Sequence, residues 1–122
     1  QTRFECFETI NRGSVDVIQP DVGRVGGLTE AKRVCDFAED KGVIVVPHCW
    51  KSAIGIAAST HLSATTLSCP YIEFLPKELA ESQLRKDLVL EELPLENGKI
   101  PLPNKPGLGI VVDEEKLNKY SV

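Results

Sequence analysis

The chain has 122 residues, a length that suits a single domain. Hydrophobic residues make up 42% and charged residues 26% of the sequence, as in an ordinary soluble globular protein. The net charge of −4 at pH 7 argues against binding to nucleic acid or to an anionic membrane surface, and no apolar run is long enough to span a bilayer.

The N-terminal part of the chain predicts a helix followed by a strand. Three apolar residues recur at near-helical spacing before Gly13, which is placed to end the helix: Phe4, Phe7 and Ile10. A short strand is predicted near residues 15–20, where Pro20 stops it.

A second helix and a second strand follow. Residues 29–41 form the clearest predicted helix, and Gly42 is in position to end it. Its apolar face consists of Ala31, Val34, Cys35 and Ala38. The next strand is predicted near residues 43–48. It opens with four apolar β-branched residues, a run that is typical of a strand buried on both faces in a parallel sheet.

A third helix and strand complete this pattern. Residues 52–65 are rich in alanine and predict a helix with a small packing face, and a strand is predicted near residues 71–75. Alternating helices and strands indicate βα units around a parallel sheet, so the predicted fold class is α/β.

The chain changes character after Pro76, so residues 1–75 and 76–122 are predicted to be two structural layers. In the second layer, residues 77–86 are compatible with one amphipathic helix. Three further features are predicted there: a hairpin turn at Asn97-Gly98 between apolar segments 88–90 and 100–102, a backbone turn at 107–109, and a helix at 113–120 capped by Asp113.

The four cysteines are Cys6, Cys35, Cys49 and Cys69. They form no C-x-x-C pair and do not cluster with the two histidines, and three of them lie in apolar segments. This distribution favours buried, reduced thiols, and we therefore expect a cytoplasmic protein.

Three polar residues lie at or near the ends of the predicted strands. Asp21 follows the first, His48 ends the second and Glu73 lies in the third. Adjacent strands are roughly 5 Å apart, so Asp21 is expected to reach a ring nitrogen of His48. A carboxylate there would orient the imidazole and raise its basicity, as a general base requires.

Structural roles remain open for the same residues. Asp21 is also placed to be a loop or cap residue, His48 to be a satisfied structural group, and Glu73 to be half of a salt bridge. His61 is expected to be structural, because it lies in the middle of a predicted helix among small residues.

Four segments carry a family resemblance. Residues 16–31 resemble the sixth strand and following helix of enolase-superfamily barrels, and residues 46–50 resemble the end of the seventh strand. Residues 71–74 resemble the eighth strand and residues 106–109 the C-terminal turn. The chain thus resembles the C-terminal portion of the mandelate racemase and muconate-lactonizing enzyme family, over nearly its whole length and in the right order.

The resemblance also points to a subgroup. Asp21 stands where muconate-lactonizing relatives carry lysine, and mandelate racemase relatives pair such an aspartate with a histidine that ends the next strand, as His48 does. Residues 47–50 are similar to those of acid-sugar dehydratases. The resemblance implies a segment of a TIM-type (β/α) barrel, with residues 76–122 packing on a capping domain.

The resemblance implies an acid–base mechanism on a small carboxylate such as an acid sugar. His48 would act as base or acid at the carbon next to the carboxylate, and Asp21 would hold its tautomer. Glu73 would stabilise the enediolate, and Trp50 would contact substrate. A dehydratase is expected. A racemase or epimerase of the same subgroup, or a truncated fragment without catalysis, are the alternatives.

Enolase-superfamily relatives bind Mg²⁺ through carboxylates on earlier strands of the barrel, so the resemblance implies no metal ligand in this chain. Mg²⁺ normally provides the main stabilisation of the enediolate. The 122 residues alone are therefore not expected to turn over substrate. Unpaired sheet edges and an apolar inner face lead us to expect association with further barrel segments or with a second copy, as a homo-oligomer.

Overall fold

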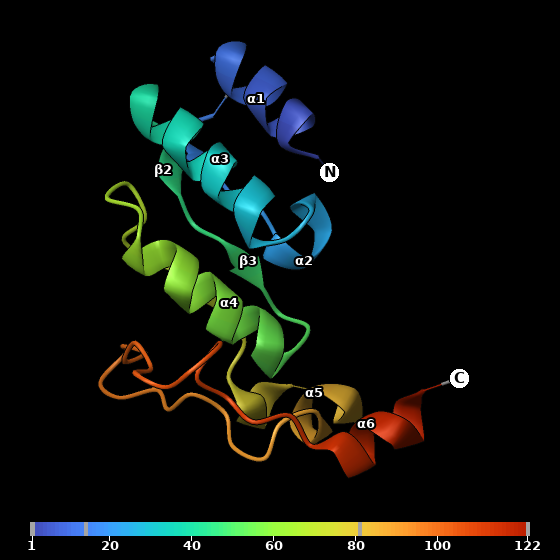
Figure 1. The fold of residues 1–122 in the computed structure, drawn as a ribbon. Coiled ribbons are helices and arrows are strands. Elements are labelled where there is room, and N and C mark those ends of the chain that lie inside the picture. Colours follow the sequence, from blue (N-terminus) through green and yellow to red (C-terminus); the bar gives the residue numbers. More distant parts are fainter. Residues whose placement is uncertain (1, 14, 81, 122) are drawn as a thin grey trace.

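The computed structural model describes residues 2–13, 15–80 and 82–121 (Figure 1). The helices are α1 (Arg3–Asn11), α2 (Val22–Val25), α3 (Leu28–Asp40), α4 (Ala53–Ala64), α5 (Gln83–Asp87) and α6 (Glu114–Tyr120), with a 3-10 helix at Lys77–Leu79. The strands are β1 (Val17–Ile18), β2 (Ile44–Val45), β3 (His48–Cys49) and β4 (Glu73–Phe74). None of the helices in these ranges is both long and apolar enough to cross a membrane.

The short strands pair in parallel. β1 pairs with β2, and β3 pairs with β4 so that His48 lies beside Glu73. Only Val46 and Pro47 separate β2 from β3, and the Val46 N–H donates to the Ile18 carbonyl at 3.0 Å. The β2–β3 segment is therefore the middle of three adjacent parallel segments, with β1 on one side and β4 on the other. The predicted βα units are confirmed, although every strand is shorter than the range predicted for it.

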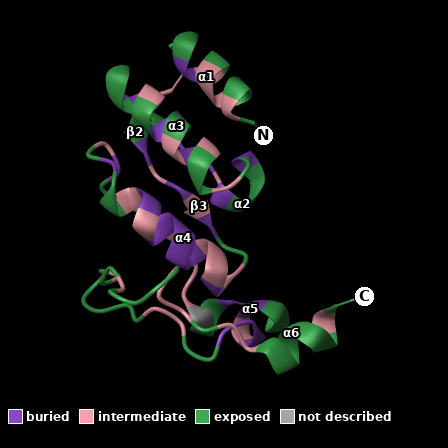
Figure 2. Ribbon diagram, in the orientation of Figure 1, coloured by how far each residue is buried: buried purple, intermediate pink, exposed green. Residues whose placement is uncertain are grey.

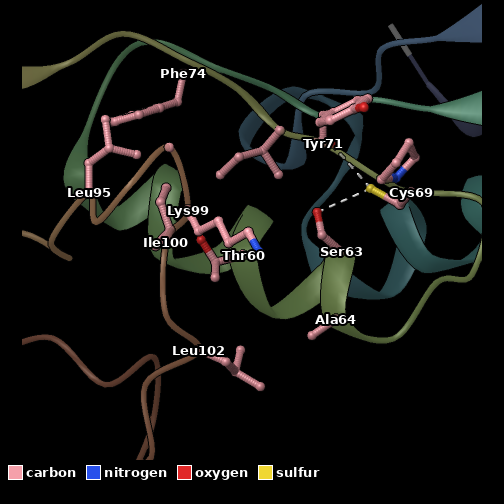
Figure 3. A pocket seen from close by; sticks show the side chains of 13 residues that line it. Thr60, Ser63, Ala64, Cys69, Tyr71, Phe74, Leu95, Lys99, Ile100 and Leu102 are labelled. Atoms are coloured by element: carbon pink, nitrogen blue, oxygen red, sulfur yellow. Dashed lines mark hydrogen bonds between the residues drawn. The ribbon is translucent and has the colours of Figure 1, made fainter.

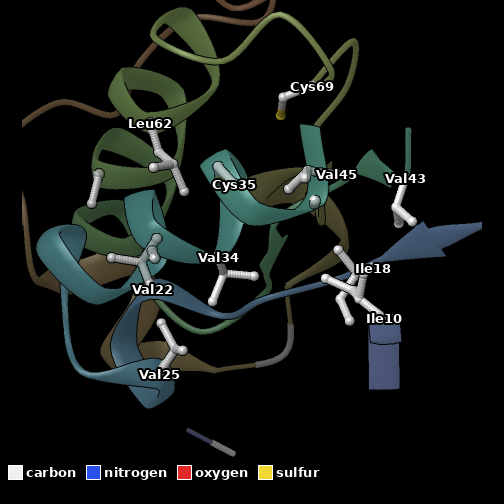
Figure 4. Packing of buried hydrophobic residues seen from close by; sticks show 13 residues of the cluster. Ile10, Ile18, Val22, Val25, Val34, Cys35, Val43, Val45, Leu62 and Cys69 are labelled. Carbon is white, nitrogen blue, oxygen red and sulfur yellow. The ribbon is translucent and has the colours of Figure 1, made fainter. Parts of the chain in front are cut away.

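Helices α3 and α4 cover one side of this sheet. The predicted apolar face of α3 is fully buried, because Ala31, Val34, Cys35 and Ala38 are each 0% exposed. Figure 4 shows Val34 and Cys35 close to Val45 of β2, with Leu62 of α4 on one side of the cluster and Ile10 of α1 on the other. Burial of a side chain such as Val34 stabilises the fold by about 1.5–3 kcal/mol.

The opposite side of the sheet is open to solvent in the described part of the chain. Ile44 and its register partner Val17 are each 43% exposed, whereas their neighbours Val45 and Ile18 are buried. Successive side chains of a strand point to opposite faces, so only the face towards the helices is covered. The prediction that residues 43–46 are buried on both faces is therefore wrong for this chain, and the predicted apolar inner face is exposed.

The prediction of one helix over residues 77–86 is also wrong. The 3-10 helix ends at Leu79, and α5 begins after Ser82, whose hydroxyl accepts a hydrogen bond from the Arg85 N–H at 3.4 Å. Ser82 can cap a new helix because its side chain satisfies one of the free N–H groups of the first turn. Glu81 lies outside the described residues.

The remaining C-terminal predictions are confirmed in part. Asn97 and Gly98 have φ values of 50° and 75° and form the predicted turn, closed by bonds between Glu96 and Lys99. Segment 88–90 does not pair with 100–102. Val89 instead bridges Val112, since the prolines on the far side of the turn lack the N–H groups that a longer ladder needs.

The end of the chain follows prediction closely. Asp113 caps α6 by accepting from the Lys116 N–H at 3.1 Å, and Gly107 and Gly109 have positive φ in the predicted turn. The Tyr120 hydroxyl donates to Asp87 at 2.8 Å and ties α6 to α5. Lys116 of α6 also donates from Nζ to Oδ1 of Asp87 at 3.4 Å. Figure 2 shows that α5 has buried positions whereas α6 is mostly exposed, so these polar contacts with Asp87 carry much of the docking of α6.

Candidate active site

His48 and Asp21 lie in contact at the carboxyl ends of neighbouring strands. The Nδ1 atom of His48 is 3.1 Å from Oδ2 of Asp21, and the side chains are 30% and 17% exposed. The second oxygen of Asp21, Oδ1, accepts from the Gly23 N–H at 2.9 Å. Asp21 is therefore both the cap of α2 and the partner of His48, so two roles that sequence reasoning treated as alternatives coexist.

Backbone pairing brings this contact about. The His48 N–H donates to the Pro20 carbonyl at 3.2 Å, which places the first residue of β3 beside the turn that carries Asp21. A hydrogen bond to the carboxylate favours the tautomer with the proton on Nδ1. That tautomer leaves the lone pair of Nε2 as the basic position of the ring.

A cation completes the surroundings of the carboxylate. The Nε atom of Arg24 is 3.5 Å from Oδ2 of Asp21, the same oxygen that faces His48. Arg24 is half-exposed, so this pair is partly screened by water. Sequence reasoning assigned Arg24 no role, although its position three residues after the cap Asp21 on α2 was a usable signal.

Glu73 lies at the same sheet edge on the other side of His48. Its Oε2 atom accepts a hydrogen bond from the Nε2 amide of Gln19 at 2.8 Å. Gln19 follows β1, so its side chain crosses the middle line of the sheet to reach Glu73 of β4. Sequence reasoning missed Gln19. The available signal was its position two residues before Asp21, because alternate residues of an extended segment share a face.

Trp50 packs against the histidine. The two ring centroids are 5.4 Å apart at an interplanar angle of 30°, and Trp50 is 49% exposed. Both rings line a cavity of about 220 Å³ together with Asp21, Arg24 and Lys51. The structure thus brings the four predicted site residues to one edge, with Asp21, His48 and Trp50 around one small cavity and Glu73 beside it.

A larger cavity of about 600 Å³ lies elsewhere, between α4, the segment around β4 and the loop of residues 95–102. Figure 3 shows its mostly apolar lining, in which the Cys69 thiol contacts the Ser63 hydroxyl at 3.1 Å and the Tyr71 carbonyl at 3.5 Å. None of the four predicted site residues lines this cavity. Its size alone does not make it the reaction centre, because it lacks groups that exchange protons near neutral pH.

The other histidine and the cysteines have structural surroundings. Nε2 of His61 is 3.2 Å from the Leu108 carbonyl, which agrees with the structural role predicted for it. Cys49 donates to the Glu73 carbonyl at 3.1 Å, and burial raises the pKa of its thiol to about 11. Burial also raises the pKa of Cys35 to about 11, so both remain neutral thiols near pH 7 and are poor nucleophiles.

The described residues do not fit a metal ion. Across residues 2–13, 15–80 and 82–121, no group of three or more His, Cys, Asp or Glu side chains is arranged to hold one. The carboxylates flanking His48 are also already engaged, Asp21 with His48 itself and Glu73 with Gln19.

Comparison with known proteins places the geometry in a family context. The family model described as "Enolase C-terminal domain-like" matches residues 1–116. Arabinonate dehydratase of Saccharolobus solfataricus is 29% identical over 119 residues, which cover 98% of this chain and 31% of that protein. D-galactarolactone cycloisomerase of Agrobacterium fabrum is 29% identical, over 97% of this chain and 32% of that protein.

A solved structure gives the same fold. An enolase from Agrobacterium radiobacter with bound Na and L-malate superposes with a TM-score of 0.85 at 27% identity, over 97% of this chain and 33% of the other. The chain therefore spans about a third of the length of the proteins that it matches.

Proposed function

The chain belongs to the enolase C-terminal domain-like family, and we propose that it supplies the acid–base residues of an acid-sugar dehydratase. The relatives of this family include sugar-acid dehydratases and a cycloisomerase, so the substrate we propose is a small hydroxylated carboxylate.

One observation carries the proposal: the contact of 3.1 Å between Nδ1 of His48, the first residue of β3, and Oδ2 of Asp21. Asp21 holds the proton on Nδ1, so Nε2 is free to remove the hydrogen from the carbon next to the substrate carboxylate. The resulting imidazolium lies beside the negative charge of Asp21, which stabilises it. Trp50 covers one face of the ring and contributes to the substrate cavity.

Loss of the hydroxyl completes the reaction. The C–H electrons first pass into the substrate carboxylate and give an enediolate. They then form a double bond to the next carbon as the C–O bond of that carbon breaks, and the proton now on His48 passes to the departing hydroxyl, which leaves as water. The enol that remains becomes a 2-keto acid when its carbon takes up a proton and its hydroxyl releases one to water. His48 thus serves first as base and then as acid and ends the cycle neutral.

Glu73 supports the developing negative charge in this proposal. Its Oε2 atom is occupied by the Gln19 amide, so Oε1 is the oxygen that remains to meet the substrate carboxylate. When Glu73 is protonated, it donates a hydrogen bond to the enediolate oxygen.

Enolase-superfamily members generally depend on a metal. The described residues do not form a metal site, so the steps above use only groups of this chain. We propose that Mg²⁺ is held by other segments of the complete protein, since the matched relatives are about three times as long.

A second candidate is a cycloisomerase, racemase or epimerase with the same acid–base pair, and the likeness to D-galactarolactone cycloisomerase favours it specifically. Such an enzyme would return the proton to the substrate rather than expel a hydroxyl. A fragment without catalysis is the third possibility.

The test compares His48→Asn with His61→Gln in the longest natural protein that carries this chain, assayed with a set of sugar acids and Mg²⁺ in D₂O. We expect His48→Asn to lower kcat by ~10²–10⁴-fold, the usual contribution of a general base. His61→Gln is the matched control, because it changes the histidine that contacts Leu108 and should leave the rate within a few-fold.

The product distinguishes the candidates. Formation of 2-keto acid supports the dehydratase, and exchange of the α-hydrogen without loss of water supports the cycloisomerase or racemase. Undiminished turnover by His48→Asn would exclude His48 as the base, and an inactive parent protein would support the non-catalytic fragment.

A further inference from the structure

Arg85 is the largest fully buried side chain in the described part of the chain, at 0% exposure. Resting on the function proposed above, we propose that Arg85 is a positioning residue that holds the segment following β3, and with it Trp50 and His48, in working position. Sequence reasoning gave it no role.

The contacts of the guanidinium converge on the active-site edge. Nη1 donates to the Trp50 carbonyl at 3.3 Å, and Nη2 donates to Oε2 of Glu92 at 3.3 Å. The guanidinium carbon lies 6.0 Å from the centroid of the Phe74 ring. Arg85 therefore contacts the residue that stacks on His48 and the residue that follows Glu73, while Glu92 compensates its charge.

The Trp50 carbonyl is an effective place to restrain the site. It lies two residues after His48, where the chain leaves the sheet and has no strand partner beyond Cys49 in the described pairing. The backbone of Trp50 determines where its ring meets His48. The buried Arg85 guanidinium, by donating to the Trp50 carbonyl, therefore orients the stacked rings of Trp50 and His48 without contacting either ring.

The burial of this ion pair is costly, which indicates a role beyond stability. Glu92 is only 12% exposed at its side chain, and among the described residues Arg85 Nε and Glu92 Oε1 have no hydrogen-bond partner. Buried ion pairs are often no more stabilising than apolar residues of similar size. A planar guanidinium can serve Trp50 and Glu92 at once, which a lysine ammonium on a flexible stem does less well.

The experiment replaces both partners, because loss of one would leave an unpaired buried charge and a poorly folded protein. The variant is Arg85→Met with Glu92→Leu in the longest natural protein that carries the chain. Lys86→Met, the next residue of α5, is the matched control. The measurements are hydrogen exchange resolved by peptide, the thermal midpoint, kcat, KM and the pH dependence of kcat.

We expect the double variant to keep its thermal midpoint while the N–H groups of residues 48–52 exchange at least tenfold faster and those of α3 and α4 are unchanged. We also expect kcat to fall by ~10–100-fold with a smaller change in KM, because a small misplacement of a catalytic group lowers the rate steeply. The pH dependence of kcat should shift, since the surroundings of the His48 ring change. Lys86→Met should leave all of these as in the parent.

Unchanged exchange at residues 48–52, or an unchanged kcat and pH profile in the folded double variant, would overturn the inference and reduce the pair to a structural contact. Failure of the proposed function is separate. A parent protein that transforms no sugar acid would refute that function, and exchange at residues 48–52 would still decide whether Arg85 holds the segment.

Discussion

His48 and Glu73 are register partners in the parallel pairing of β3 and β4. Each also has a partner supplied from the β1 side of the sheet, since Asp21 meets His48 and Gln19 meets Glu73. The histidine and the carboxylate are thus neighbours whose orientation depends on a third segment. Changes in the residues around β1 are therefore expected to alter the chemistry without touching the proposed base.

Asp21→Asn is expected to retain the fold and lose activity. Asparagine is as good a helix cap as aspartate, so the bond from the Gly23 N–H and the start of α2 should persist. An amide cannot balance the charge of an imidazolium and does not enforce the proton on Nδ1. We expect kcat to fall by ~10²–10⁴-fold, as for loss of an orienting carboxylate in other acid–base systems. Exchange of the substrate α-hydrogen in D₂O measures the effect.

Asp16→Asn is the control for this change, because Asp16 is exposed and precedes the same strand. Asp16→Asn should leave the exchange of the substrate α-hydrogen in D₂O unaltered. Equal activity of Asp21→Asn and the parent would mean that Asp21 is a cap and nothing more.

Tyr120→Phe is expected to change how the docking of α6 depends on pH. The hydrogen bond from Tyr120, followed by one from Gln83, holds the pKa of Asp87 below its ordinary value of 3.8. A lowered carboxyl pKa contributes stability above pH 3.8, and that stability is lost as the pH falls through the lowered value. The same bond to Asp87 raises the pKa of Tyr120 above 10.0, so its contribution is present below pH 10.0 and is lost as the pH rises through the raised value.

Hydrogen exchange of α6 as a function of pH tests this. In the parent, the protection of the α6 N–H groups from exchange should fall at both the acid and the alkaline ends of the pH range. In Tyr120→Phe this protection should be weaker and should depend less on pH between those ends. Tyr71→Phe is the control, because Tyr71 is 72% exposed. If α6 loses protection at the same acid and alkaline pH values in Tyr120→Phe as in the parent, the contact between Tyr120 and Asp87 does not hold α6 in place.

Gly109→Ala is expected to be much more damaging than Gly107→Ala. Both glycines have positive φ, of 74° and 66°, so either substitution costs about 1 kcal/mol in backbone strain. At Gly109 an added Cβ would also lie 2.3 Å from Cβ of Pro103, in a ring that cannot rotate away, whereas nothing lies within 4 Å at Gly107. Overpacking adds about 1–3 kcal/mol. In urea unfolding, the midpoint concentration of Gly109→Ala should therefore be well below that of Gly107→Ala. Equal midpoints would contradict the close approach of Gly109 to Pro103.

Local patterns predicted most of the helices. α3 was evident from the spacing of its buried residues, α4 from its alanine-rich composition, and α6 from Asp113 at a position where a side chain can cap. α5 was not predicted as a separate helix, because the amphipathic pattern of residues 77–86 is compatible with one continuous helix and does not show that a new helix begins after Ser82. The apolar run at residues 43–46 predicted burial on both faces, because such a pattern does not reveal whether anything covers the second face of a strand. The exposed inner face, which includes Ile44, was expected only from the family resemblance.

The sequence predicted that Asp21 would contact His48, but it did not predict that Gln19 and Arg85 would contact residues of the candidate site. The strand ends indicated that Asp21 would reach His48, and the structure has this contact. Gln19 and Arg85 reach partners on elements distant in sequence through long side chains. A local pattern can place Gln19 on the same face as Asp21, but it does not specify which residue either side chain contacts. The catalytic roles of Asp21, His48 and Glu73, the substrate contact of Trp50, and the packing of residues 76–122 on a capping domain remain predictions.

Trp50 is the single tryptophan of the 122 residues, and its ring is stacked on the imidazole of His48. An excited indole transfers an electron readily to a protonated imidazole and poorly to a neutral one. The emission of this tryptophan therefore reports the charge on the adjacent histidine, so the chain carries an optical probe of its own ionisation at the place where the proposed chemistry occurs.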